Sequence, residues 1–217
     1  MDSNTFREII GLVSQRQPAH EEELRDLDAA LGDGDLGITV SAGSRAVCAA
    51  LEPLTDEATF TAILIACGKA FSVANPSTFA ALIGGGLLAA AKSAEGKTEL
   101  GRADILELAD ALAGRIVARG KAQLGDKTIL DALLPSLDTF RNSLDSPEVL
   151  NEMILIAQCQ IDETASLQSA RGRASWGQER SIGHKDPGAT AYLRFLEDLL
   201  IVISPGTQRP DLSDVGT

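Results

Sequence analysis

Aromatic residues are scarce in this chain. Only 4% of its 217 residues are Phe, Trp or Tyr, whereas apolar residues as a whole reach 44%, with Ala and Leu dominant among them. A β-sandwich of this length would need more β-branched and aromatic residues to fill the space between its sheets. Ala and Leu are strong helix formers, so the composition favours packed helices.

Long apolar runs are missing, and positive charge is low. No apolar stretch approaches the roughly 18 residues of a membrane-spanning helix, and no secretory signal opens the sequence. The 19 Lys and Arg residues face 31 Asp and Glu residues, which gives a formal net charge of −12. A charge of that sign argues against nucleic acid or an anionic membrane as the main partner. We therefore expect a cytoplasmic protein that binds neither.

Cysteines are few, and linker segments are absent. Cys48, Cys67 and Cys159 are far apart, odd in number and set in apolar surroundings, so we expect reduced core thiols rather than disulfides. The length suits one large domain or two small ones. Because no segment resembles an interdomain linker, we predict one domain over residues 1–203. Residues 204–217, which contain Pro, Gly and Asp, are expected to form a flexible tail.

Residues 28–37 form the most informative stretch, with the sequence Asp-Ala-Ala-Leu-Gly-Asp-Gly-Asp-Leu-Gly. The carboxylates of Asp28, Asp33 and Asp35 repel one another unless a cation lies between them. Mg2+ takes oxygen ligands at about 2.0–2.1 Å and leaves positions open for phosphate oxygens. The interleaved glycines permit a sharp turn that brings the carboxylates together. A solvated acidic loop is the alternative, but three Asp interleaved with three Gly favour a metal and phosphate site.

A predicted helix follows this acidic turn and extends to residue 51. Its amino-terminal residues are Leu36, Gly37, Ile38 and Thr39. Free N–H groups and the helix dipole at such a terminus favour an anion. Groups suited to a metal and groups suited to a phosphate therefore lie within a few residues of one another.

Helical periodicity recurs along the rest of the chain, and no strand pattern is convincing. The predicted helices cover residues 4–16, a short run from 21, 38–51, 56–73, 79–92, 102–119, a run from 129, 147–168 and 186–203. Three consecutive glycines, residues 84–86, lie inside one of them, and we expect close helix packing there rather than ligand contact. The sequence thus predicts an all-α fold of about eight helices.

A basic segment stands out in this acidic chain. Residues 171–188 contain Arg171, Arg173, Arg180, His184 and Lys185. The planar guanidinium group of Arg is well suited to phosphate. On charge alone, a solvated basic loop is the favoured alternative.

Four blocks of the sequence together resemble the L subunit, the nucleotide-binding subunit, of dihydroxyacetone kinases. They are Leu27-Asp28 with residues 32–37, residues 75–78, residues 120–133 with Gly-Asp-Lys-Thr at 125–128, and residues 171–190. The resemblance implies a barrel of antiparallel helices that binds ADP or ATP and two Mg2+ ions at one end. It departs from the family at Leu36, where many members have His or Cys, and at residues 75–78, where the family has Gly-Gly-x-Ser-Gly.

The resemblance also implies roles for individual residues. Asp28, Asp33 and Asp35 would be the metal ligands, and Arg173 would be the catalytic residue that stabilises charge on the transferred phosphoryl group. The implied nucleotide-binding residues are Leu36, Gly37, Ile38, Thr39, Ser77 and Thr78 at the phosphates, Gly120 and Ile129 at the adenine, and Arg173, Asp186, Pro187 and Gly188 closing the site.

A partner follows from the same resemblance. In this family a His on a separate K subunit or domain holds the carbonyl substrate covalently, and neither His20 nor His184 lies in such a block. The chain would then be a ketose kinase subunit that is active only with a K-type partner, with a phosphotransfer protein that rephosphorylates ADP as a further partner. The sequence leaves open whether the chain forms a homodimer. Three alternative functions also stay open: a non-catalytic nucleotide-sensing subunit, a kinase subunit for a larger ketose such as a tetrulose, and the nucleotide domain of another kinase such as fatty-acid kinase.

Overall fold

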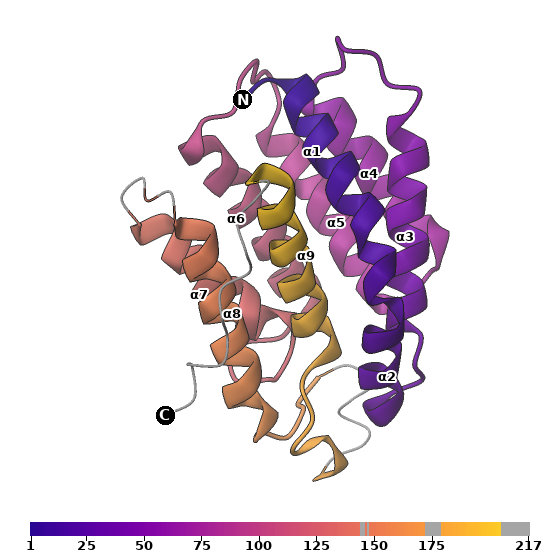
Figure 1. Cartoon of the computed structure of the whole chain (residues 1–217), viewed down its shortest axis with the longest axis vertical. Helices are drawn as coiled ribbons and strands as arrows, with labels where there is room; N and C mark the ends of the chain where they lie inside the picture. The colour runs from indigo at the N-terminus through magenta and orange to yellow at the C-terminus, as the bar shows by residue number, and fades with distance from the viewer. Residues whose placement is uncertain (144–145, 147, 172–178, 205–217) are drawn as a thin grey trace. The chain divides into compact units, whose positions relative to one another are not determined.

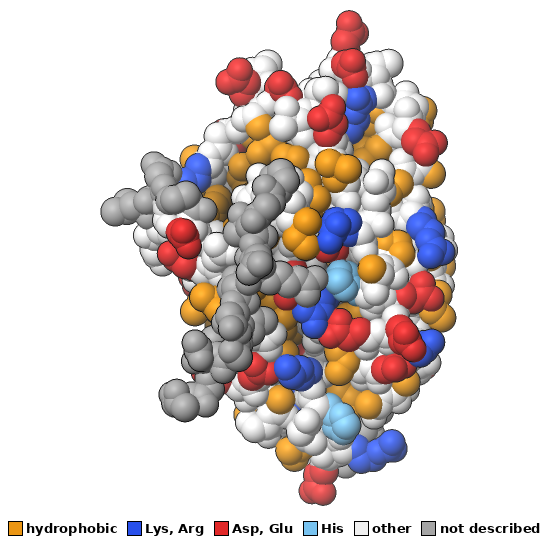
Figure 2. Space-filling model, in the orientation of Figure 1, with side chains coloured by type: hydrophobic (Ala, Val, Ile, Leu, Met, Phe, Trp, Pro, Cys, Tyr) orange, Lys and Arg blue, Asp and Glu red, His pale blue; other side chains and the backbone are white. Residues whose placement is uncertain are grey.

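The structure is a computed structural model that describes residues 1–143, 146, 148–171 and 179–204. Within these residues it contains nine α-helices and no strand (Figure 1). The all-α prediction is therefore confirmed. None of the described helices is both long and apolar enough to cross a membrane. Figure 2 shows acidic side chains spread over the visible face, with Lys and Arg side chains among them.

The contacts within the chain define two compact units. Unit 1 comprises residues 1–21 and 38–121, and unit 2 comprises residues 22–37 and 122–217. The prediction of a single domain over residues 1–203 stays a prediction. The predicted tail, residues 204–217, lies outside the described residues apart from its first position.

Unit 1 is built on three consecutive helices that pack side by side. Helix α5 packs against both α4 and α6, and α1 contacts α4. Phe60 and Leu64 belong to one cluster of buried apolar side chains, and Ile63 and Phe71 to a second. The elements are α1 (Ser3–Arg16), a 3-10 helix (Gln17–His20), most of α3 (Leu36–Leu51), α4 (Phe60–Ala74), α5 (Thr78–Ser93) and α6 (Arg102–Gly120).

The glycine run of α5 lies where this helix meets its two neighbours. A Cβ atom on Gly84 would lie 1.8 Å from Ser72 Oγ and 2.7 Å from the carbonyl oxygen of Gly68, both on α4. A Cβ atom on Gly86 would lie 2.8 Å from Leu112 Cγ on α6. Such distances leave no room for a side chain. The expected close helix packing is confirmed at these two positions.

Unit 2 contains a second group of mutually packed helices. Its elements are α2 (Glu21–Leu31, except the first residue), the turn before α3, α7 (Ile129–Asn142), α8 (Val149–Ala165) and α9 (Pro187–Ile203). Helices α7, α8 and α9 pack pairwise against one another. Leu130, Ile154 and Leu193, one from each of these helices, are almost completely buried.

Some helix ends differ from the predicted boundaries, because capping side chains decide them. Helix α4 begins at Phe60 rather than near residue 56, since the Thr59 hydroxyl accepts a hydrogen bond from the Ala62 amide at 3.2 Å. Helix α8 ends at Ala165, three residues before the predicted end. Pro147, predicted to open α8, lies outside the described residues.

Candidate metal and nucleotide site

A tight turn, residues 32–35, connects α2 to α3. Gly34 adopts a φ of 73°, in the left-handed region that favours glycine. A Cβ atom on Gly32 would lie 2.9 Å from Asp28 Oδ1 and 3.3 Å from the Asp28 carbonyl oxygen. One glycine thus permits the turn, and the other leaves space for the Asp28 carboxylate.

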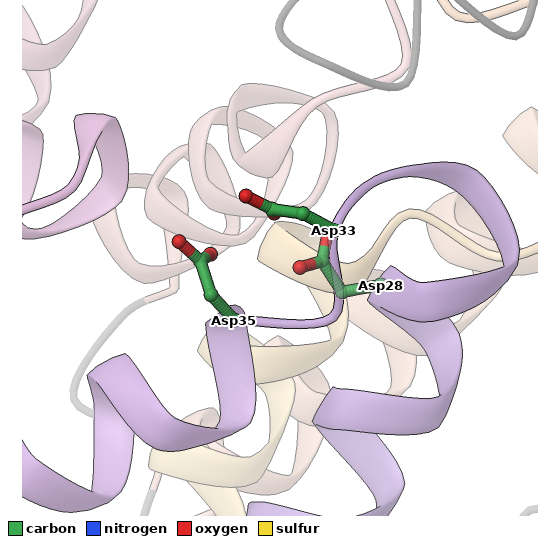
Figure 3. A group of neighbouring side chains, drawn as sticks. All are labelled: Asp28, Asp33 and Asp35. Carbon is green, nitrogen blue, oxygen red and sulfur yellow. The ribbon is translucent and has the colours of Figure 1, made fainter.

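The three predicted metal ligands come together around this turn. One carboxylate oxygen from each of Asp28, Asp33 and Asp35 lies within 4.8 Å of the other two. Figure 3 shows the three side chains extending from α2 and from the turn before α3 toward a shared space. The Leu36 amide donates a hydrogen bond to Asp28 Oδ2 at 3.1 Å, which orients that carboxylate.

The geometry of this carboxylate cluster can be compared with the needs of a divalent cation. Opposite ligands of one octahedral Mg2+ lie about 4.2 Å apart, twice the usual bond length of about 2.1 Å. The cluster, whose three oxygens all lie within 4.8 Å of one another, is of this size, and a small rotation of the exposed Asp33 side chain would adjust it. Two ions about 3.5–4 Å apart, as in two-metal phosphoryl-transfer sites, also match this span. The donors are all hard carboxylate oxygens, which suit Mg2+.

Electrostatics at the cluster also favour a cation. Burial raises the pKa of Asp35, and the negative charge of Asp28 raises it further. Both effects disfavour the ionised carboxylate. A bound divalent cation would offset both, because it supplies positive charge where solvent is partly excluded.

Helix α3 begins directly after Asp35, and the boundary between the two units follows Gly37. The Leu36 amide is already used by Asp28. Gly37 is buried, while the Ile38 side chain is 49% exposed. The predicted anion-binding terminus therefore adjoins the carboxylate cluster along the chain.

Two further predicted phosphate contacts meet within unit 1. Thr39 Oγ1 donates to Ser77 Oγ at 3.4 Å, and Ser77 Oγ accepts from the Ala80 amide at 3.1 Å as the N-cap of α5. Thr78, the first residue of α5, is exposed. Asn75 donates from Nδ2 to Thr39 Oγ1 at 2.8 Å. Asn75, which was not among the predicted site residues, orients the Thr39 hydroxyl through this bond.

A buried lysine organises the polar interior of unit 2. The Lys127 side chain is 1% exposed, and Nζ donates to the carbonyl oxygens of Ala165, Leu167 and Ser181 at 3.0, 2.9 and 2.5 Å. All three N–H bonds of the ammonium group are thus satisfied. Burial lowers the pKa of Lys127, and the nearby Asp186 carboxyl opposes this shift. The sequence marked Lys127 only as part of the Gly-Asp-Lys-Thr block and did not predict this role.

The cap of α7 adjoins this lysine. Thr128 is the N-cap of α7, and its Oγ1 accepts a hydrogen bond from the Leu130 amide at 3.3 Å. Asp131 is 2% exposed, and its carboxylate accepts hydrogen bonds from the amides of Gly125 at 2.5 Å and Thr128 at 2.6 Å. The Asp131 side chain therefore points inward and closes the turn before α7.

The start of α9 brings three of the predicted nucleotide-binding residues together. Asp186 caps the helix, accepting from the Ala189 amide at 2.7 Å, and Pro187 and Gly188 form the first turn. Burial raises the pKa of Asp186 to about 7, and the charge of Asp131 adds to the shift. This carboxyl therefore changes its charge near neutral pH.

The remaining predicted residues are less informative. Gly120 ends α6 in unit 1, and Ile129 begins α7 in unit 2. Arg173 lies outside the described residues, as do positions 172 and 174–178 of the basic segment.

The described ends of the basic segment carry ion pairs within unit 2. Arg171 Nε donates to Asp126 Oδ2 at 3.0 Å, and Lys185 lies 2.7 Å from a carboxylate oxygen of Asp162. The amide of Gly183 also donates to the carbonyl of Ala165 at 2.8 Å. Acidic side chains and helix-end carbonyls therefore hold these ends.

Comparison with known proteins identifies the family. The DAK2 domain matches residues 30–200. The ADP-binding subunit DhaL of the PEP-dependent dihydroxyacetone kinase of Escherichia coli strain K12 is 30% identical over 184 residues, 83% of this chain and 87% of that protein. The L-erythrulose 1-kinase of Mycolicibacterium smegmatis is 34% identical over 187 residues, 83% of this chain but only 32% of that longer protein.

A solved structure shows the same fold. The crystal structure of the dihydroxyacetone kinase from C. freundii in complex with AMP-PNP and Mg2+ superposes with a TM-score of 0.72 at 24% identity. The match covers 89% of this chain and 33% of that one. The chain therefore belongs to the DAK2 domain family and is a member of its DhaL-type, dihydroxyacetone kinase L-subunit group.

Proposed function

We propose that this chain is the nucleotide- and Mg2+-binding subunit of a dihydroxyacetone-type ketose kinase of the cytoplasm. The observation that carries the proposal is the convergence of Asp28, Asp33 and Asp35 immediately before α3 in a DhaL-type chain. The E. coli relative is named as an ADP-binding subunit, and the C. freundii kinase was crystallised with AMP-PNP and Mg2+. Both names support a nucleotide and Mg2+ as the ligands.

The roles of the chain's residues follow from their chemistry. We assign two Mg2+ ions to Asp28, Asp33 and Asp35. When bound, these ions neutralise phosphate charge and polarise the phosphoryl group. The assigned phosphate contacts are the first turn of α3, residues Leu36, Gly37, Ile38 and Thr39, through the amides that Asp28 does not already occupy, and the hydroxyl groups of Ser77 and Thr78. Both sets lie at helix amino termini, which suit anions.

The other assignments complete the nucleotide site. We place Gly120 and Ile129 at the adenine, and Asp186, Pro187 and Gly188 at its closure. Arg173 is assigned the catalytic role, because a guanidinium group can stabilise charge that develops on the phosphoryl group in flight. The family resemblance supports each of these roles.

The acceptor sugar requires a second protein in this proposal. We infer a K-type subunit that holds the ketose, and a phosphotransfer protein that regenerates the bound nucleotide from ADP. The E. coli relative is named as a subunit of a PEP-dependent kinase, and this name supports both inferences. The chain alone would then bind nucleotide without phosphorylating a sugar.

A single-turnover assay tests the proposal whether the nucleotide exchanges freely or is held tightly. The chain is loaded with Mg-ATP labelled at the γ-phosphate and mixed with dihydroxyacetone, with and without the substrate-binding subunit of the E. coli kinase. We expect labelled sugar phosphate only when both subunits are present. Transfer by the chain alone would contradict the need for a partner. Nucleotide binding without transfer by the pair would favour a non-catalytic sensing subunit.

A tetrulose is the second candidate substrate. The observation in its favour is the 34% identity to the L-erythrulose 1-kinase of M. smegmatis. Erythrulose in place of dihydroxyacetone in the same assay, with a partner subunit from an erythrulose kinase, distinguishes the two. Faster transfer to erythrulose would assign the chain to a tetrulose kinase.

A further inference from the structure

An ion pair links α2, the helix that carries Asp28, to α9 within unit 2. Arg194 on α9 donates from Nε to Glu23 Oε2 at 2.7 Å and from Nη2 to Glu23 Oε1 at 2.6 Å. Two parallel hydrogen bonds of this kind fix both the distance and the orientation of the two side chains. The pair joins residues 171 positions apart in the sequence.

The guanidinium group of Arg194 is itself held in place. Its remaining nitrogen, Nη1, donates to Glu197 Oε2 at 2.8 Å, one turn further along α9. Glu197 is 1% exposed, and a carboxylate so deeply buried needs a charged partner. Hydrogen bonding to Glu23 and Glu197 raises the pKa of Arg194, so the group stays charged. The edge of the guanidinium group formed by Nε and Nη2 therefore faces Glu23 on α2 in a fixed orientation.

Two buried leucines hold part of helix α2 in place. Among its described residues only Leu24 and Leu31 are buried. Arg25, its one basic residue, lies 2.8 Å from Asp26 and 3.7 Å from Glu22, both on the same helix. The two hydrogen bonds to Arg194 add a direct polar connection from α2 to α9, which belongs to the packed α7–α9 group.

The metal site depends on where α2 lies. Asp28 follows Glu23 by five residues, which is about 7.5 Å along a helix axis at 1.5 Å per residue. A helix this short moves as a rigid body, so a tilt at Glu23 shifts the Asp28 carboxylate as well. All three candidate ligand oxygens lie within 4.8 Å of one another, and a shift of the Asp28 carboxylate would change these separations.

We propose that Arg194 and Glu23 act as positioning residues for the metal site, because their ion pair holds α2 where Asp28 can share a cation with Asp33 and Asp35. This inference rests on the proposed function. Neither residue touches the cation. Their loss would widen the carboxylate cluster and weaken metal binding while the fold persists.

The test measures Mn2+ affinity of the full chain without nucleotide, by the loss of the electron paramagnetic resonance signal of free Mn2+. Glu23→Gln removes the charge that pairs with Arg194 and keeps the Arg194–Glu197 bond. Glu22→Gln is the matched control, because it removes the same charge from the neighbouring residue of α2. We expect Mn2+ binding to weaken about three- to tenfold in Glu23→Gln and less than twofold in Glu22→Gln.

Two further measurements separate positioning from folding. Arg194→Lys keeps the positive charge but loses the two-bonded geometry, so its affinity should lie between those of the wild type and Glu23→Gln. Melting temperatures of the metal-free variants show whether the fold is intact. Equal Mn2+ affinities for Glu23→Gln and Glu22→Gln would overturn the positioning role alone. A wild-type chain that binds no Mn2+, or an Asp33→Asn variant that binds it as well, would overturn the metal site and this inference with it.

Discussion

The two units of the chain bury different kinds of polar residue. Among the described residues of unit 1, the buried polar side chains are all uncharged: Ser14, Gln17, Thr39, Ser41 and Ser44. The described residues of unit 2 bury six ionisable side chains, those of Asp126, Lys127, Asp131, Asp186, Glu197 and Asp198. A buried charge is costly unless hydrogen bonds and counter-charges compensate it. Close packing therefore determines how the helices of unit 1 fit together, whereas hydrogen bonds and charges of buried groups connect the helices of unit 2.

The contrast is clearest in how each unit holds its helices together. In unit 1, glycines let α5 lie close against α4 and α6. In unit 2, the single ammonium group of Lys127 joins the end of α8 to the segment around Ser181. We therefore expect added side-chain atoms to destabilise the helix packing of unit 1, and removal of the hydrogen-bond donor to destabilise unit 2.

The largest effect should follow the loss of Lys127. Lys127→Met keeps most of the side-chain volume but leaves three inward carbonyl oxygens without their donor. We expect the free energy of unfolding to fall by about 3–5 kcal/mol, the usual cost of breaking a buried charged network. Urea unfolding followed by circular dichroism measures this change.

Lys185→Met is the matched control for that experiment. Lys185 also belongs to unit 2, but its pair with Asp162 is half exposed. Exposed pairs contribute about 0–1 kcal/mol, so the control should change little. Similar losses in both variants would contradict the view that buried polar connections hold unit 2.

The next effect concerns pH and the buried Asp186. Its pKa lies near 7 in the folded chain against an ordinary value of 3.8, so the folded state binds a proton that the unfolded state has released between these values. The stabilisation that this carboxyl group gives to the folded state is complete below about pH 4, and it is lost as the pH rises toward about 7. Three pH units at about 1.4 kcal/mol each give a loss of up to about 4 kcal/mol.

Asp186→Asn isolates this contribution, because an amide keeps an oxygen for the Ala189 amide and carries no charge. Urea midpoints of wild type and variant should diverge from pH 5 to pH 8, with the variant more stable at the upper end. Parallel pH profiles would contradict a charge penalty at Asp186.

A smaller effect is expected from the glycines of unit 1. Gly84→Ala would place Cβ 1.8 Å from Ser72 Oγ and should cost about 1–3 kcal/mol by overpacking. Gly85→Ala is its matched control, since Cβ there would lie 3.6 Å from Arg115 Nε, an ordinary contact. Alanine favours the helix over glycine by about 0.5–1 kcal/mol, so Gly85→Ala should stabilise the chain. Thermal unfolding of both variants should show opposite signs, and the same sign in both would refute the packing account.

Local patterns in the sequence predict features of both units. Helices with apolar periodicity, the glycine packing of α5 and the Thr128 cap of α7 are local signals, and the structure has all of them. The acidic turn was equally predictable, because its three carboxylates and three glycines lie within ten consecutive residues, 28–37.

The features that sequence reasoning missed are contacts between distant positions. Lys127 bonds to carbonyls 38–54 residues away, Asn75 to Thr39, and Arg194 to Glu23. No periodicity or short motif marks such partners, because each depends on tertiary packing. A charged residue inside a short polar block, such as Lys127 between Asp126 and Thr128, is the closest local signal.

The most direct test of the central claim is calorimetric titration of Mg-ADP into the wild-type chain, Asp33→Asn and Asp35→Asn. Asp26→Asn is the matched control, because it removes an exposed carboxylate from α2 close to the site. We predict that Asp33→Asn and Asp35→Asn each weaken binding at least tenfold, about 1.4 kcal/mol, that Asp26→Asn stays within twofold of wild type, and that wild-type binding falls without Mg2+. Unchanged affinity in both Asp33→Asn and Asp35→Asn would contradict the assignment of the metal and nucleotide site to this turn.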